Sequence, residues 1–331
     1  MHYERDAVST KTSDHYVPAT YLRQFIDPRL KGGRTHVFRK RTGQCTPQLP
    51  NDICKIRGGD LNKYFEQADL LRDYLRPFEN TWSSTIGHML NGQNDADDHF
   101  FISGMMAYIK HCCPTTKRLG GRFLEQQLED LRPLLARHVQ QEMIGGDLAD
   151  HVADALLDGG IRINVDFDFA RALAMRSMTS TLARIFTGSW RILMNDTELP
   201  FVTTDFPVCN HYWTENDVIG TVYFPLAPQI AVTIEPSTDE VPEPLDVRRL
   251  RMGPVEYLAI QPRGVELFNS LLIQSAEDQV ITRKQYRAFT ETCRAFSDWR
   301  MECIMDKIPF ENGFYQVVRL RPRRNASNKS K

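Results

Sequence analysis

Hydrophobic residues recur at three- and four-residue spacing through most of the middle of the chain, a pattern that predicts amphipathic helices. The clearest case is residues 69–90, where large apolar side chains share one side of a helical wheel and Pro77 is expected to kink the helix. Further helices are predicted over residues 97–111, 122–143, 147–157 and 168–194. Residues 266–297 are predicted to be helical as well, with a break in the middle.

The apolar period changes to two on either side of this helical region. Residues 35–49 alternate around a Thr-Gly pair, which predicts a β-hairpin. After Asn195, the stretches "ELPFVTTDFPVCN", "TVYFPLAPQIAVTIEP" and finally "GFYQVVRLRP" are predicted strands. We therefore expect an α+β fold with a helix-rich middle, an N-terminal hairpin and later antiparallel strands. One domain is expected over residues 14–320, followed by a basic, disordered tail at 321–331.

Composition and net charge indicate the general class of protein but not its function. The 331 residues are 41% hydrophobic and 25% charged, with a net charge of −1, an ordinary globular balance. This charge gives no global attraction to nucleic acid, although a local basic patch remains open. No apolar run is long enough for a membrane helix, and the charged start lacks the apolar segment of a signal peptide. We expect a cytoplasmic protein whose seven cysteines are reduced.

The familiar catalytic and metal-binding motifs do not occur. The chain has no Gly-x-x-x-x-Gly-Lys phosphate loop, no Gly-x-Gly-x-x-Gly, no Gly-x-Ser-x-Gly and no His-Glu-x-x-His. His111, Cys112 and Cys113 are adjacent on a predicted helix and diverge by about 100° each, so they favour a core position over a metal site. Cys209 and His211 share one strand face, but two ligands are too few for a metal ion.

Three polar residues stand in apolar surroundings. Glu79 falls at the edge of the apolar stripe of residues 69–90, where it either reaches solvent or lines a cleft. Asn269 lies within the apolar arc of its helix, so its amide must tie the helix to a loop or face a polar cavity. Asp205 follows a predicted strand, a position that suits both functional carboxylates and turn caps.

The segment "SDHYVPATYLRQF" at residues 13–25 is the most specific stretch. Ser13 or Asp14 can cap a short helix that Pro18 begins, and Tyr21 and Phe25 then share one face. This leaves His15 and Arg23 in need of partners. His15 can serve as a base, a ligand or a cap, or it can be structural.

This segment carries a family resemblance. "HYVPATYLRQF" resembles the His-Tyr-Val-Pro-x-x-Tyr-Leu-Arg-x-Phe hallmark of an uncharacterised domain of unknown function found in bacteria and fungi. Weaker similarities follow in the same order, over roughly residues 14–290: "PFENTW" with Glu79, "TTDFPV" with Asp205, "YFPLAP", and "LFNSLL" with Asn269. The resemblance implies a shared fold and carries no established activity.

Two departures from the family pattern concern polar residues. The family has Arg-Thr-Pro after its second helix, whereas this chain has "CCPTTKR", so the basic role moves to Lys117 or Arg118, or is lost. The family's Asn after the Asp is Phe206 here, which implies altered activity if that Asn belongs to a reaction centre.

Two hypotheses about function follow. In the first, His15, Glu79 and Asp205 act as acid and base or hold a divalent ion such as Mg²⁺ or Mn²⁺. Arg23, Tyr21, Arg118 and Asn269 would then bind an anionic substrate, a phosphodiester or nucleic acid, and the enzyme would be a hydrolase that serves as a defence effector. In the second, the same polar residues form a buried network in a non-catalytic interaction or scaffold module.

Overall fold

The computed structural model describes residues 13–325 except 58, 60–61, 66, 68–69, 143–145, 163, 213–219, 242–244 and 311–312. It confirms the α+β class: helices fill the middle of the chain, and antiparallel strands stand before and after them. The helices are α1 (Ala19–Leu22), α2 (Leu70–Leu90), α3 (Ala96–Cys112), α4 (Pro114–Glu142), α5 (Asp147–Leu157), α6 (Phe167–Arg176), α7 (Met178–Phe186), α8 (Pro262–Ser275) and α9 (Arg287–Ala295). Within the described part of the chain, no helix combines the length and the apolar character that crossing a membrane requires.

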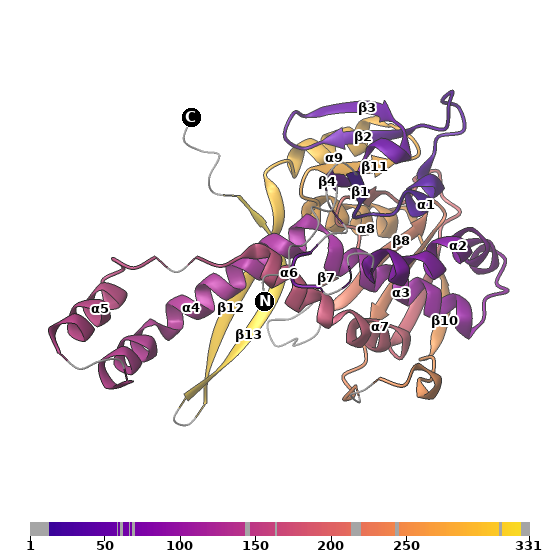
Figure 1. The fold of residues 1–331 in the computed structure, drawn as a ribbon. Helices are drawn as coiled ribbons and strands as arrows, with labels where there is room; N and C mark the ends of the chain where they lie inside the picture. Colours follow the sequence, from indigo (N-terminus) through magenta and orange to yellow (C-terminus); the bar gives the residue numbers. More distant parts are fainter. Residues whose placement is uncertain are drawn as a thin grey trace.

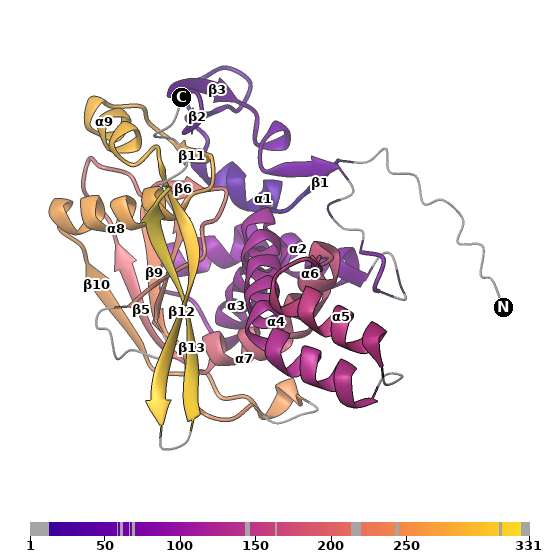
Figure 2. The same ribbon diagram turned by 90° about the vertical axis from the view of Figure 1, so that its left-hand side faces the viewer.

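A five-stranded sheet forms the centre of the molecule (Figure 2). Its strands are β5 (Ser189–Met194), β7 (Cys209–His211), β8 (Thr221–Ala227), β9 (Ile230–Glu235) and β10 (Val255–Ala259), in the order β10-β5-β9-β8-β7. Only the β10–β5 pair is parallel among these neighbours. One face packs on α2, α3 and α7, and the other packs on α8. Every residue of β8 is buried, as expected for a strand covered on both faces.

A smaller antiparallel sheet carries the predicted hairpin. β2 (Thr35–Arg39) and β3 (Gln44–Gln48) pair as the sequence indicates. Two later strands complete the order β3-β2-β11-β6, namely β11 (Gln279–Thr282) and β6 (Thr203–Thr204). Beside them β1 (Ser13–His15) pairs with β4 (Lys55–Arg57). The expected cap of the first helix at Ser13 or Asp14 is therefore replaced by a strand, and Pro18 is the N-cap of α1.

An arm made of α4 and α5 projects from the body, and the long hairpin of β12 (Trp299–Phe310) and β13 (Gly313–Arg324) runs beside α4 (Figure 1). The core between α4 and α5 is small and consists of Ala136, Ala153 and Leu156 with three partly buried neighbours. β13 extends to Arg324 because it pairs with β12 along its whole length. Residues 321–324 are thus strand rather than tail, and residues 326–331 lie outside the described residues.

Two regions that were predicted to be helical from their apolar spacing contain a strand as well. The helix expected over residues 168–194 consists of α6 and α7 and is followed by β5, which buries Trp190 and Ile192 by alternation. Gly188 permits the turn between them, since a Cβ there would lie 2.5 Å from the carbonyl oxygen of Glu235. The region 266–297 contains β11 between α8 and α9. In both cases a short apolar run fits either period, and strand pairing decides the outcome.

Candidate functional site

Asp205 holds the loop that joins α8 to β11. The residue follows β6, and its own N–H donates to the carbonyl oxygen of Gln279 at 3.0 Å. Its Oδ1 accepts from the N–H of Glu277 at 2.9 Å, and its Oδ2 accepts from the N–H groups of Asp278 at 2.8 Å and Gln279 at 2.9 Å. One carboxylate therefore binds three successive backbone amides of a segment more than seventy residues away.

The electrostatics of Asp205 combine two opposed effects. The residue is buried, and burial raises its pKa to about 6 because a charged carboxylate loses hydration in the interior. The three N–H donors act in the opposite direction, since they stabilise the charged form. The carboxyl group therefore titrates close to neutral pH, which is the range where an acid–base catalyst works best.

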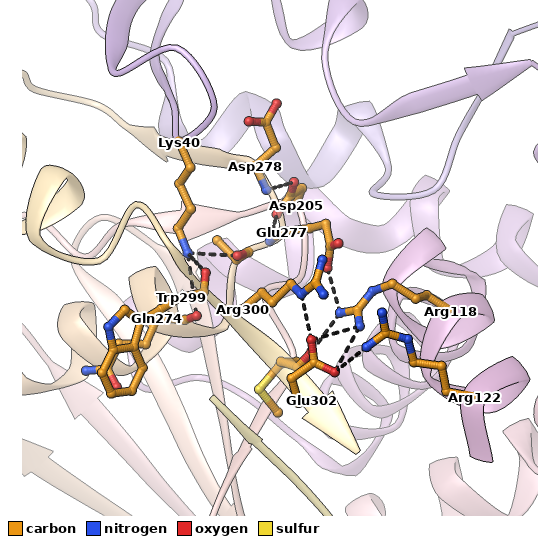
Figure 3. A network of polar contacts seen from close by, with 12 residues as sticks. Lys40, Arg118, Arg122, Asp205, Gln274, Glu277, Asp278, Trp299, Arg300 and Glu302 are labelled. Atoms are coloured by element: carbon orange, nitrogen blue, oxygen red, sulfur yellow. Dashed lines mark hydrogen bonds and ion pairs between the residues drawn. The ribbon is translucent and has the colours of Figure 1, made fainter. Parts of the chain in front are cut away.

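Arg118 binds the same loop from the other side (Figure 3). From α4, its Nη2 donates to Glu277 Oε2 at 2.9 Å and to the carbonyl oxygen of Met301 at 2.6 Å. Its Nη1 lies 3.4 Å from both carboxylate oxygens of Glu302, which also binds Arg122 and Arg300. Arg118 thus joins the loop after α8 to β12.

Lys40 is a buried cation held by carbonyl oxygens. It follows β2, and its Nζ donates to Ala276 at 2.8 Å, to Trp299 at 2.7 Å and to Gln274 at 3.5 Å (Figure 3). A cation suits this position because Gln274 and Ala276 lie at the C-terminal end of α8, where the helix dipole is negative. Burial lowers the pKa of Lys40 to about 8.

A pocket of about 300 Å³ opens beside Asp205, and we call it the Asp205 pocket. Its lining combines acidic residues, basic residues and the start of α4: Asp205, Glu277, Asp278, Gln279, Arg39, Arg41, Lys55, Tyr16, Ile56, Pro114 and Thr115. Asp278 lies 3.3 Å from the Arg39 guanidinium and 3.7 Å from that of Arg41. The structure therefore brings basic and acidic side chains from four separate segments to one cavity.

His15 and Arg23, predicted as a catalytic and a binding residue, lie near this region without lining the pocket. His15 is opposite Lys55 in the β1–β4 pair, and burial and Lys55 lower its pKa. Its buried Nδ1 has no hydrogen-bond partner in the described part of the chain. Arg23 is exposed and donates to Asn51 at 3.2 Å.

Glu79, the second predicted carboxylate, is half-buried on α2, and the Thr20 hydroxyl donates to it at 3.4 Å. This contact joins α2 to α1, whereas Asp205 contacts the loop after α8. Glu79 does not line the Asp205 pocket. Of the predicted site residues, only Asp205 lines that pocket, and Arg118 reaches it through Glu277.

Tyr21 and Asn269, both predicted to bind substrate, direct their polar atoms to internal partners. The Tyr21 hydroxyl is 2.6 Å from the Thr203 hydroxyl and donates to the carbonyl oxygen of Pro225 at 2.8 Å, and its ring stacks on Phe224. Asn269 accepts from the N–H of Val202 at 3.0 Å and donates to the carbonyl oxygen of Pro200 at 2.9 Å. Both residues fasten other elements to the segment around β6.

Tyr21→Phe is expected to lower the free energy of unfolding by about 1–2 kcal/mol, because it leaves the carbonyl oxygen of Pro225 and the Thr203 hydroxyl without a buried partner. Urea unfolding measures the change. Affinity for any ligand of the Asp205 pocket should stay the same, and a selective loss of affinity at unchanged stability would contradict the structural role.

The comparisons with known proteins bear on this arrangement. A family model for DUF4238, described as a protein of unknown function, matches residues 14–286. The chain belongs to the DUF4238 family. This confirms the resemblance carried by "HYVPATYLRQF". Neither the comparison with curated proteins nor the comparison with solved structures gave a match.

The DUF4238 match includes every residue that lines the Asp205 pocket. Trp299, Met301 and Glu302 lie beyond it, so the partners that β12 supplies to Lys40 and Arg118 are outside the matched region. Phe206, which stands where the resemblance places an Asn, is buried in the main core. Lys117 binds Asp168, whereas Arg118 binds the loop of the pocket.

Sequence reasoning missed Lys40, Glu277, Asp278 and Glu302. Glu277 and Asp278 fall in a region expected to be helical, and an acidic pair there resembles a solvated surface. A better signal was available: a helix whose apolar stripe ends at residue 276 and is followed by a short β-branched run predicts a loop at that point. Among the described residues, no group of three or more His, Cys, Asp or Glu is placed to hold a metal ion.

Proposed function

We propose that this DUF4238 chain acts on an anionic ligand in the Asp205 pocket. The observation that supports it is a titratable carboxyl group, with its pKa raised to about 6, in an open cavity that also contains Arg39, Arg41 and Lys55. Raised pKa values and convergent charged groups in a cavity are features of functional sites.

The basic residues provide the anion contacts. Arg41 is the most available of them, because 78% of its side chain is exposed and its contact with Asp278 is 3.7 Å long. Arg39 and Lys55 are about one-third exposed, with Lys55 3.7 Å from Asp52. Arginine matches the geometry of a phosphate with two parallel N–H donors. A phosphate or phosphodiester is therefore the ligand class that this set of side chains favours.

The catalytic form of the proposal is hydrolysis with Asp205 as the acid–base group. A water oxygen attacks the phosphorus while Asp205 takes the water proton, the bond to the leaving oxygen breaks, and Asp205 returns the proton to that oxygen. Oδ1 accepts from only one backbone amide and keeps a lone pair for the water proton, whereas Oδ2 accepts from two. The arginines would stabilise the charge that develops on the phosphate oxygens.

A non-catalytic module is the second candidate. It is favoured by the internal bonding of Asp205, Tyr21 and Asn269, each of which fastens two segments of the fold together. In this case the Asp205 pocket would bind an anionic partner without converting it. Asp205 would only hold the loop after α8 through its hydrogen bonds.

The test measures pyrophosphate binding by calorimetry and hydrolysis of bis(p-nitrophenyl) phosphate, each with and without Mg²⁺ or Mn²⁺. Arg41→Gln is expected to weaken binding about tenfold, since it removes a charge-assisted contact. Arg34→Gln is the matched control, because Arg34 is also exposed and lies outside the pocket. Glu79→Ala examines the carboxylate predicted from sequence.

The outcomes separate the two candidates. Turnover that depends on Arg41 and is lost in Asp205→Asn supports the hydrolase. Binding that depends on Arg41 without turnover supports the non-catalytic module. Absence of binding, or binding that Arg41→Gln leaves unchanged, rejects the Asp205 pocket as the ligand site.

A further inference from the structure

A second pocket, of about 240 Å³, lies between α3, α7 and the edge strand β7, and we call it the Lys110 pocket. Its polar lining consists of Lys110, Thr181, Arg184, Asn210 and Tyr212. Lys110 comes from the last turn of α3 and Arg184 from α7. Two cationic side chains and no carboxylate thus line this cavity among the described residues, in contrast to the Asp205 pocket.

Lys110 is half-buried, and its ammonium group has one hydrogen-bond partner in the described part of the chain. Its Nζ donates to Asn210 Oδ1 at 3.0 Å, and within the described part of the chain the ammonium group forms no other hydrogen bond and no ion pair. An ammonium carries three donors, so two remain for another partner. Loss of hydration lowers the pKa of Lys110 to about 8, and no carboxylate among the described residues opposes this effect. Charged groups that lose part of their hydration are stabilised by a counterion.

Arg184 has the same surplus of donors. Its Nη1 donates to the carbonyl oxygen of Ser237 at 3.0 Å, and no carboxylate pairs with it in the described region. The guanidinium has five N–H donors, so most of them remain available. Thr181, which also lines the pocket, has its hydroxyl 2.8 Å from the Nε2 of His111. Burial lowers the pKa of His111, so this imidazole is neutral at neutral pH and adds no further charge.

We propose that the Lys110 pocket is a binding site for a small oxyanion, the phosphate or carboxylate group of a small molecule. Lys110 supplies a point charge and Arg184 a planar fork that fits either group. The oxyanion would be the counterion that the described residues do not supply to these two side chains. This site is separate from the Asp205 pocket and does not depend on the function proposed there.

The first experiment uses the unaltered full-length protein. Lysines are modified by reductive methylation with and without inorganic phosphate, with acetate as a second arm, and Lys110 is quantified by mass spectrometry. Phosphate or acetate is expected to slow modification of Lys110 and to leave the exposed Lys31 unaffected. Protection by phosphate alone identifies a phosphate site, and protection by acetate at equal concentration identifies a carboxylate site. Equal modification of Lys110 under all conditions overturns the proposal.

The second experiment compares variants by calorimetry with the protecting anion. Lys110→Met is expected to lower its affinity about tenfold or more, because it removes a charge-assisted contact at nearly constant volume. The variant should fold, since it removes an unpaired charge rather than an ion pair. Lys31→Met, at an exposed position outside both pockets, is the matched control and should leave the affinity of this site unchanged. Affinity that is insensitive to Lys110→Met would also refute the oxyanion site.

Discussion

Asp205→Ala is expected to lower the free energy of unfolding by about 3 kcal/mol or more, making it one of the most damaging single changes in this chain. The substitution leaves the N–H groups of residues 277–279 without their acceptor, and each unsatisfied buried donor costs about 1–3 kcal/mol. Relief from burying the carboxylate, whose pKa is raised, offsets part of this cost. Urea unfolding at neutral pH measures the difference.

Two further variants test whether this loss of stability comes from the hydrogen bonds of the Asp205 carboxylate. Asp205→Asn keeps one carbonyl oxygen for the amides of Asp278 and Gln279 but turns an NH₂ group toward Glu277, so its loss should be about half as large. Asp196→Ala, a change of the same type at an exposed position, should stay within about 0.5 kcal/mol of the unaltered protein. A loss below about 1 kcal/mol for Asp205→Ala would show that the loop is held by other contacts.

Acidification from pH 7.5 to pH 5 is expected to lower the free energy of unfolding by about 3 kcal/mol. Burial lowers the pKa of His99 from its ordinary 6.5 to about 4 and that of His111 to about 3. The unfolded chain therefore takes up protons below pH 6.5 while the folded chain does not. Stability is complete above pH 6.5, and each histidine removes about 2 kcal/mol of it by pH 5, since one pH unit corresponds to about 1.4 kcal/mol.

Asp205 acts in the opposite direction. Its pKa in the folded protein, about 6, is above the ordinary 3.8, so the folded chain takes up this proton first. Its protonation raises the free energy of unfolding by about 1.4 kcal/mol between pH 6 and pH 5. The net loss over the whole range is therefore about 3 kcal/mol. His15, whose pKa is also lowered, adds to the loss.

Urea unfolding at a series of pH values measures this dependence, and His111→Gln assigns it. Glutamine does not titrate and can still reach Thr181, so the loss between pH 7.5 and pH 5 should shrink to about 1 kcal/mol. His138→Gln, an exposed control, should preserve the full loss. Stability that is flat or that rises on acidification would show that the buried imidazoles accept protons in the folded state.

The fold could be predicted from sequence where one apolar period dominates. Residues 69–90 form α2 almost as expected, and the hairpin of residues 35–49 becomes β2 and β3. The failures concern short apolar runs, such as β5 and β11, which satisfy helical and strand spacing together. Their strand form depends on pairing with β9 and with β2 and β6, partners that local sequence does not contain.

Less of the candidate site could be predicted from the sequence, because its contacts join residues far apart in the chain and often involve backbone atoms. Asp205 was recognised as a carboxylate at the end of a strand, but its partners are backbone amides, which every residue carries and which no motif marks. Arg118 meets Glu302, 184 residues further along the chain. Lys40 stands at a hairpin turn, where a lysine is ordinarily solvated, and only the fold places it at the end of α8.

The position of β12 has a consequence for biosynthesis. Lys40 and Arg118 are made early, yet the carbonyl oxygens of Trp299 and Met301 and the carboxylate of Glu302 come from a hairpin that the ribosome makes much later. Until that hairpin has left the exit tunnel, the side chains of Lys40 and Arg118 lack some of their hydrogen-bond partners. The five-stranded and the four-stranded sheet already have all their strands at that stage. The nascent chain is therefore expected to acquire its layered core first and to close the region around Asp205 last.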